Sequence, residues 1–278
     1  MKRRLSYSQI TTWQRCRKRW HWNYIEDLVS RKKGAPLLIG DLTHRLRESF
    51  LKGELSVNQI QNLIPHVKEL YPNEDDFILT DVALTAAGLL NAYIEKYEED
   101  GTVKIISTET HLEKDMGSFL LYARLDGIAT VKGSNGLWRE ELKTSSRTDS
   151  AFLQGQNRGL QTGISMWLME ELMTEEVRGT VFTQLVKTKV PQCHIKPVVK
   201  SDIMIKITKE AVRNHAREIE EGLIYQSGQC FAYNRECSYM ILCKNDTQRN
   251  REEFFQSGGR KQAALDSEKE KKGGEEED

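Results

Sequence analysis

The sequence lacks any long apolar run. Stretches such as "FLLYA" and "SMWLM" are far shorter than the about 20 apolar residues that a membrane-spanning helix needs. The basic start "MKRRLSYSQITTW" has no apolar segment behind it, so we expect no secretory signal. With 38% hydrophobic residues, 29% charged residues and a mean hydropathy of −0.60, the 278-residue chain is typical of a soluble cytoplasmic protein with one large domain or two small ones.

Cysteine is scarce, with five residues in the chain. Without an export signal, so few thiols argue against a disulfide framework and for metal binding or reactivity. Cys230, Cys237 and Cys243 lie close together near the C-terminal end. Three sulfurs are one short of a tetrahedral metal site.

The sequence has no net charge, but its charge is unevenly distributed. Residues 1–33 carry ten Lys and Arg against two acids, and the basic residues alternate with Trp13, Trp20, Trp22 and Tyr24. Such a segment could follow a phosphate backbone and offer stacking faces to bases. The commoner arrangement, which we favour for this segment alone, is a solvated helix face over buried aromatic residues.

Apolar residues at helical spacing predict helices in the first 100 residues. They cover residues 5–26, 37–56 and 56–100, the last broken near Pro65 and Pro72. The pattern then changes to strands over residues 103–114, 118–131 and 137–143, followed by a helix over 150–173.

The C-terminal third predicts short strands and one more helix. The predicted strands are 178–189, 193–200 and 202–207, and Thr208 is expected to cap a helix over 209–226. We find no internal repeat. After Cys243 the composition becomes highly charged, so we expect one domain over residues 1–245, with a helical insertion at about 50–100, and a disordered tail over 246–278.

The strongest candidate for a catalytic site is a hairpin closed by "KGSNG". Its geometry places Asp126 opposite Glu141, and the alternation of the strand puts Glu141 and Lys143 on one face, with Glu140 and Leu142 on the other. Two carboxylates opposite one another repel, so a cation between them is expected. Lys143 or a hard divalent ion would supply that charge, although ordinary surface hairpins also carry such residues.

At these residues the chain resembles a known family. "LDGIATVKGSNGLWREELKT" resembles the core of the PD-(D/E)XK nuclease superfamily, with Asp126, a hairpin and then Glu141-Leu142-Lys143, and with Leu125 in place of the usual proline. "GDLTH" resembles the Gly-x-x-x-His element of the RecB/AddB-type branch, which includes CRISPR-associated RecB-like nucleases and phage exonucleases. "LQTGISMW" resembles its Gln motif, although Ser165 stands where that motif has tyrosine. The resemblance covers roughly residues 5–245.

The resemblance implies a fold, an activity and a set of site residues. The fold is a restriction-endonuclease-like α/β core, a mixed central sheet flanked by helices, with an N-terminal helical region. The activity is that of a Mg²⁺- or Mn²⁺-dependent deoxyribonuclease, most plausibly an exonuclease on single-stranded or end-exposed DNA in recombination, repair or phage DNA processing, in the cytoplasm of a bacterium or a phage-infected cell. The implied metal ligands are His44, Asp126, Glu141 and the Leu142 carbonyl, with Lys143 orienting the water, Gln161 on the following helix, and Glu109 and Glu113 as more distant carboxylates.

The same branch closes its fold with a 4Fe–4S cluster, held by one N-terminal and three C-terminal cysteines. For this chain, the resemblance implies four cluster ligands: Cys16, Cys230, Cys237 and Cys243. A cluster on these residues would join the N-terminal helix to the C-terminal edge. A zinc site on the same thiolates and scattered buried thiols are the alternatives. Cys193 has no counterpart and is interpreted as a strand thiol.

A different class of function is also compatible with this sequence. It is a non-catalytic iron–sulfur DNA-binding or scaffold subunit of a helicase–nuclease or CRISPR adaptation complex. The complete set of His44, Asp126, Glu141 and Lys143 favours the enzyme, because an inactive copy is free to lose these residues. A helicase or recombination protein is the partner that either hypothesis would expect, and neither requires a membrane.

Overall fold

The computed structural model describes residues 2–56, 63–146, 150–232 and 235–259. The chain divides into two compact units. The first, here the sheet unit, contains Met1–Tyr7 and Lys33–Asn214, and the second, here the cysteine unit, contains Ser8–Lys32 and His215–Asp278. This division differs from the single domain expected from the sequence, because the segments before Lys33 and after Asn214 pack with each other.

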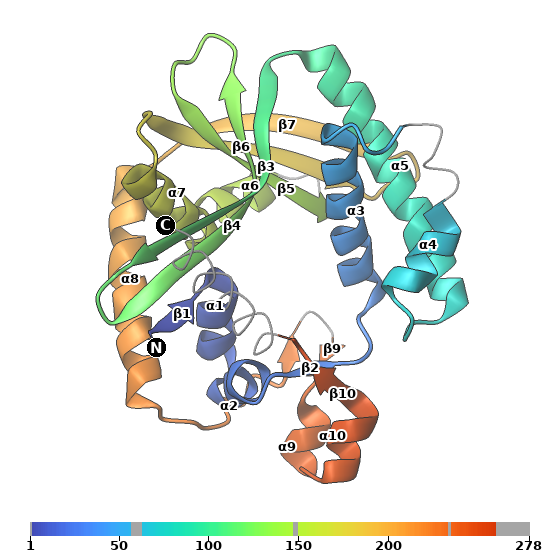
Figure 1. Cartoon of the computed structure of the whole chain (residues 1–278), viewed down its shortest axis with the longest axis vertical. Coiled ribbons are helices and arrows are strands. Elements are labelled where there is room, and N and C mark those ends of the chain that lie inside the picture. The colour runs from blue at the N-terminus through green and yellow to red at the C-terminus, as the bar shows by residue number, and fades with distance from the viewer. Residues whose placement is uncertain (1, 57–62, 147–149, 233–234, 260–278) are drawn as a thin grey trace, which may run out of the picture. The chain divides into compact units, whose positions relative to one another are not determined.

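The sheet unit is built on a mixed sheet of six strands, in the order β1-β4-β5-β6-β7 with β3 paired to the other edge of β4 (Figure 1). The pairs β1–β4 and β5–β6 are parallel, and β3–β4, β4–β5 and β6–β7 are antiparallel. The predicted mixed α/β sheet is therefore confirmed. Its strands are β1 Arg3–Leu5, β3 Val103–Asp115, β4 Phe119–Val131, β5 Leu137–Ser145, β6 Val177–Val186 and β7 Gln192–Val199.

Helices cover this sheet. The helices α3, α4 and α5 form an apolar core with Leu142 and Leu185 of the sheet, whereas α7 contacts β3, β4 and β6. Figure 1 shows α3 and α5 on one side of the strands and α7 on the other. The helices of this unit are α3 Ala35–Leu51, α4 Leu63–Leu70, α5 Asp76–Asp100, α6 Ser150–Asn157, α7 Leu160–Leu172 and the first part of α8 Asp202–Glu221.

By length and composition alone, α5 could cross a membrane, and it is the one such helix among the described residues. Its apolar residues are nevertheless those of a core helix, since Leu79, Val82, Leu89 and Leu90 are buried in the cluster that α3 also lines. The helix begins at the N-cap Asp75, whose carboxylate accepts a hydrogen bond from Phe77 N. It ends at Gly101, whose φ of 58° suits a helix C-terminus.

The predicted strand 202–207 and the cap at Thr208 are wrong, because α8 begins at Asp202 and continues through both. Ile205, Thr208 and Val212 are buried at helical spacing along one face. Thr208 packs on α7, where a Cβ at Gly163 would lie 2.0 Å from its Oγ1. The absence of a side chain at Gly163 therefore lets the two helices approach closely.

The cysteine unit begins with short helical pieces where the sequence predicts one helix. Cys16 has extended backbone, with a φ of −165°, and it separates α1 Tyr7–Arg15 from α2 Arg17–Trp20. Its Sγ accepts a hydrogen bond from Arg19 N at 3.5 Å and so caps α2. The π-helical turn η1 His21–Ile25 follows directly.

The C-terminal part of this unit has regular elements beyond Cys243, within residues 246–259 of the segment expected to be a disordered tail; residues 260–278 lie outside the described residues. The elements are β8 Phe231–Ala232, β9 Arg235–Glu236, α9 Met240–Lys244, α10 Gln248–Phe254 and β10 Phe255–Ser257. β10 pairs antiparallel with β2 Leu28–Ser30. Two segments at opposite ends of the chain thus share one small sheet.

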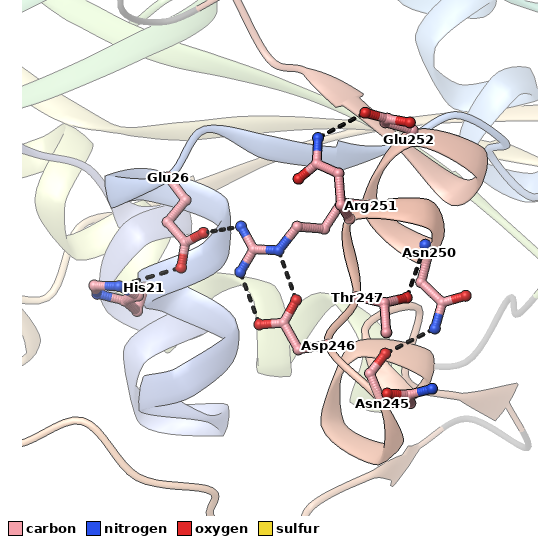
Figure 2. A network of polar contacts seen from close by, with 9 residues as sticks. His21, Glu26, Asn245, Asp246, Thr247, Asn250, Arg251 and Glu252 are labelled. Atoms are coloured by element: carbon pink, nitrogen blue, oxygen red, sulfur yellow. Dashed lines mark hydrogen bonds and ion pairs between the residues drawn. The ribbon is translucent and has the colours of Figure 1, made fainter.

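A polar network reinforces this pairing (Figure 2). Arg251 of α10 binds Asp246 through two bonds of 2.6 and 2.7 Å and also pairs with Glu26, which contacts His21. In the apolar cluster of the same unit, the ring centroids of Trp22 and Tyr239 lie 5.8 Å apart in a stack. Such a bidentate pair with a second carboxylate fixes α10 against the N-terminal segment.

Candidate active site

The sheet splits beside Asp126. β3 pairs along one edge of β4, while the other edge pairs with β1 only at Phe119–Leu121 and with β5 only at Gly127–Ala129. Within the described strands, residues 122–126 of β4 therefore have no ladder partner on that second edge. β5 continues past Glu140 paired only with β6, so an opening between β4 and β5 begins at Asp126 and Glu141.

Asp126 lies at the apex of this split. Its Oδ2 accepts a hydrogen bond of 2.8 Å from the backbone N–H of Leu142, and its Oδ1 lies 3.5 Å from Nδ1 of His44 on α3. The side chain thus satisfies a strand N–H that has lost its ladder partner. One side chain holds the end of the β4–β5 ladder and faces the predicted histidine.

The residues of β5 alternate between the two faces of the sheet, as the sequence predicts. Glu140 pairs with Arg47 of α3, and Leu142 packs in the apolar core of α3 and α5. On the opposite face, Arg139 reaches Thr162 of α7 at 3.4 Å and Lys143 Nζ donates to Gln161 Oε1 at 3.1 Å. The predicted residues Lys143 and Gln161 therefore meet.

Glu141 is held by two cations. It is 2% exposed and pairs with both Arg139, which is fully buried, and Lys143. Arg139 was not among the predicted site residues, although its position two residues before Glu141 places it on the same face of the strand. Glu141 therefore has cationic neighbours on both sides along its own strand.

The described residues that come closest to a metal-binding group are His44, Glu109 and Asp126, whose ligand atoms all lie within 4.8 Å of one another. Glu109 was predicted only as a more distant carboxylate, and Glu141 was the residue expected beside His44 and Asp126. Because the β4–β5 ladder ends at Gly127–Glu140, the carboxylates of Asp126 and Glu141 are not brought into one such group.

Glu109 enters the group through an unusual backbone conformation. Its φ is +49°, and it lies between the pairs Thr108–Gly127 and Thr110–Leu125, hence opposite Asp126. Burial and the charge of Asp126 raise the pKa of Glu109, although Arg124, at 2.9 Å, opposes this shift. A non-glycine residue in the left-handed region is uncommon, and such conformations cluster at functional sites.

The site also contains two basic side chains, His44 and Lys143, whose protonated forms are disfavoured by burial. Burial lowers the pKa of His44, although the Asp126 carboxylate opposes this. Burial likewise lowers the pKa of Lys143, with Asp126 raising it and Arg139 lowering it. A neutral imidazole leaves a ring nitrogen available to a cation.

The four predicted cluster ligands all belong to the cysteine unit, from Cys16 on the N-terminal side to Cys230, Cys237 and Cys243 on the C-terminal side. Burial raises the pKa of Cys243, and the thiols of the other three raise it further, so the four are electrostatic neighbours. Among the described residues, no three of these sulfurs lie within 4.8 Å of one another. Cys193 lies apart on β7, where burial raises its pKa to about 12.

Comparison with known protein families identifies the superfamily of this chain. The model of the PD-(D/E)XK nuclease superfamily matches residues 4–244. The chain belongs to this superfamily. Nucleases of the superfamily use divalent metals.

No curated protein matches this member of the superfamily. Among solved structures, the "Putative exonuclease" from Eubacterium rectale is 13% identical, with a TM-score of 0.49, and the match covers 78% of each chain. SSO0001 is 14% identical with a TM-score of 0.33, and the match covers 74% of this chain and 94% of that one.

Proposed function

We propose that this PD-(D/E)XK protein is a metal-dependent deoxyribonuclease that acts on single-stranded or end-exposed DNA. The observation that carries the proposal is the split beside Asp126, where a carboxylate, a neutral histidine and a lysine converge. The choice of an exonuclease, and of recombination, repair or phage DNA processing as its context, rests on the sequence resemblance alone.

The donor set suits a hard divalent cation. Carboxylate oxygens are preferred by Mg²⁺ and Mn²⁺, and Mn²⁺ also accepts an imidazole. His44 and Asp126, with Glu109 beside them, offer such donors, and Glu141 and the Leu142 carbonyl would complete the ligand set that the resemblance implies. A bound Mg²⁺ or Mn²⁺ would polarise the phosphate and activate the attacking water.

Lys143 has a separate task in this proposal. Its ammonium has three N–H donors. Among the described residues, Glu141 and Gln161 are its two partners. A third donor therefore remains for a water or a phosphate oxygen. Glu141 and Gln161 would keep Nζ in place, and the lowered pKa of Lys143 makes transfer of its proton easier.

We also propose that Cys16, Cys230, Cys237 and Cys243 hold a 4Fe–4S cluster. Tetrahedral zinc with Zn–S bonds of about 2.3 Å requires its sulfurs about 3.8 Å apart. No three described sulfurs meet even a 4.8 Å limit. Support for a 4Fe–4S cluster comes from the order of the four cysteines along the chain, which the resemblance matches, and from their placement in one unit.

The test is cleavage of end-labelled single- and double-stranded DNA by anaerobically purified protein, with Mg²⁺, Mn²⁺ or EDTA. Lys143→Ala is the site variant, and Lys104→Ala, an exposed lysine on β3, is its matched control. We expect cutting that requires metal, persists in Lys104→Ala and is lost in Lys143→Ala. The sizes of the products would distinguish an exonuclease from an endonuclease and give its polarity.

Full cleavage by Lys143→Ala would refute the role of this lysine. No cutting by a folded, brown wild-type protein that still binds DNA would refute the enzyme and support the non-catalytic binding subunit. The visible absorbance spectrum of the purified protein, together with its iron and zinc content, identifies the group that the cysteines bind.

A further inference from the structure

The cysteine unit contains a cavity of about 230 Å³ that the proposed chemistry does not use. It lies between α1–α2, the last turns of α8 and the segment that follows α8. Every residue that lines it belongs to the cysteine unit. The residues that matter here are Trp13, Gln14, Arg17, His215, Glu218 and Tyr225.

A chain of hydrogen bonds fixes the polar wall. Gln14 Nε2 lies 2.7 Å from His215 Nε2, and His215 Nδ1 lies 3.4 Å from Glu218 Oε2. With the Gln14 amide nitrogen as the donor to Nε2, the matching His215 tautomer donates from Nδ1 to Glu218. Trp13 Nε1 donates to the same Oε2 at 3.0 Å. No described residue hydrogen-bonds Oε1 of Gln14 or of Glu218.

The other wall is a stack. The guanidinium of Arg17 lies 4.9 Å from the ring centroid of Trp13 and 4.6 Å from that of Tyr225, and its Nη2 bonds Glu218 at 3.2 Å. Trp13 is 1% exposed, so its faces are not open to a ligand. Tyr225 is 50% exposed, so its ring is open to a ligand. The guanidinium of Arg17 supports the Tyr225 ring through a cation–π contact.

These groups select a flat, uncharged ligand. Glu218 in the wall disfavours a phosphate, and Arg17 is already neutralised by it. An aliphatic ligand would bury the amide and carboxylate oxygens without partners, which is costly. A ring with hydrogen-bond donors on its edge can stack on Tyr225 and donate to Gln14 and Glu218. Adenine, cytosine and guanine carry such amino groups, and every base has the required face.

We propose that this cavity binds an unstacked base of a single-stranded DNA segment. The inference rests on the proposed function, since it assumes that the substrate has single-stranded character. Lys18 and Arg19 are half-buried cations on the same short helix as Arg17, and they would supply positive charge for the phosphates that flank the base. The basic N-terminal segment would then contact DNA through cations and through Tyr225, while its tryptophans stay in the core.

The test compares binding of two labelled oligonucleotides of equal length by fluorescence anisotropy in EDTA, where no cutting occurs. One is oligodeoxycytidylate, and the other carries abasic sugars throughout. We expect the wild type to prefer the base-bearing strand by about tenfold, the effect of one good stack. Tyr225→Ala should lose that preference, and Tyr225→Phe should keep it. Phe77→Ala removes an exposed ring of the sheet unit as the matched control.

Equal wild-type affinity for both strands, or a preference that survives in Tyr225→Ala, would overturn the inference, as would no binding of either strand. If Tyr225→Ala unfolds, Gln14→Ala serves instead, since Gln14 is exposed and its loss should reduce the preference for cytosine over thymine. Cleavage is measured separately with Mn²⁺. A wild type that cuts DNA but shows no base preference refutes only the cavity, and one that prefers bases but never cuts refutes only the nuclease.

Discussion

The carboxylate of Asp126 accepts the backbone N–H of Leu142 at 2.8 Å, at the point where β4 and β5 separate. A buried strand N–H without a partner would be costly, so this side chain is structural before any metal binds. Its other oxygen faces His44. The same residue therefore closes the ladder and starts the metal site, and the two roles can be separated by mutation.

Asp126→Asn should keep the fold and lose the chemistry. The amide oxygen can still accept from Leu142, but the charge that a cation needs is gone. We expect cleavage to fall at least ~100-fold with stability within about 1 kcal/mol of the wild type, whereas Asp126→Ala should lose a further ~1–3 kcal/mol. Urea unfolding and cleavage rates, measured on both variants, check this. Equal stability of the two variants would contradict the structural role.

Glu109 should contribute directly to metal affinity. Its carboxylate is within 4.8 Å of ligand atoms of His44 and Asp126. Glu109→Gln should weaken Mn²⁺ binding about tenfold or more, since removal of one anionic ligand typically costs over 1 kcal/mol. Glu113→Gln is the matched control, because Glu113 is on the same strand and pairs with Arg4. Isothermal titration with Mn²⁺ measures both, and equal affinities in the two variants would remove Glu109 from the site.

Much of the site follows from local sequence, and the rest does not. The turn residues and the alternation of β5 suffice to place Glu141 and Lys143 on one face. The split beside Asp126 depends on β1, a three-residue strand more than 110 positions away, which no local pattern reveals. The positive φ of Glu109 cannot be predicted from the sequence either. Glutamate has no intrinsic preference for the left-handed region, so the surrounding structure must impose this conformation. The break at Cys16 was missed for a similar reason, since the helical spacing runs through it.

The buried pair Arg47–Glu140 should matter for stability and not for chemistry. Both residues are at most 2% exposed, and the ring centroid of Tyr93 lies 5.2 Å from the guanidinium of Arg47. Burial opposes the charge of each residue. It raises the pKa of Glu140 although Arg47 lowers it, and it lowers the pKa of Arg47, which Glu140, Tyr93 and Asp126 together nevertheless raise above its ordinary value. Arg47→Met leaves an unpaired buried carboxylate and should cost about 3–5 kcal/mol.

The double variant Arg47→Met/Glu140→Leu distinguishes a lost partner from lost packing. It should recover at least about 2 kcal/mol of the loss in Arg47→Met, because two apolar groups need no partner. Urea unfolding of the three proteins provides the measurement. A double variant that is less stable than Arg47→Met would show that the pair itself, and not the uncompensated charge, stabilises this layer.

Cys237→Ser should lose both the brown colour and part of the stability. Cys237 packs beside Tyr239 and Phe255 in the core of the cysteine unit, so a cluster there ties β2 to β10. Cys193→Ala is the matched control, since Cys193 is a partly buried thiol of the sheet unit and its variant should keep the colour. Visible absorbance and thermal unfolding under anaerobic conditions give the two readouts. A Cys237→Ser protein that stays brown and equally stable would refute the proposed ligand set.

Acid should weaken metal binding through His44. Burial holds its pKa below the ordinary value of 6.5, so the ring is neutral at pH 7 and protons compete with the cation only at lower pH. Between the two pKa values the unfolded chain binds more protons than the folded one, so His44 also makes stability fall as the pH drops below about 6.5. Mn²⁺ affinity measured from pH 7.5 to pH 5 should therefore fall more steeply for the wild type than for His44→Gln, which has weaker affinity and lacks this titration. Parallel pH profiles of the two proteins would show that the histidine is not a ligand, and that carboxylates alone carry the pH dependence.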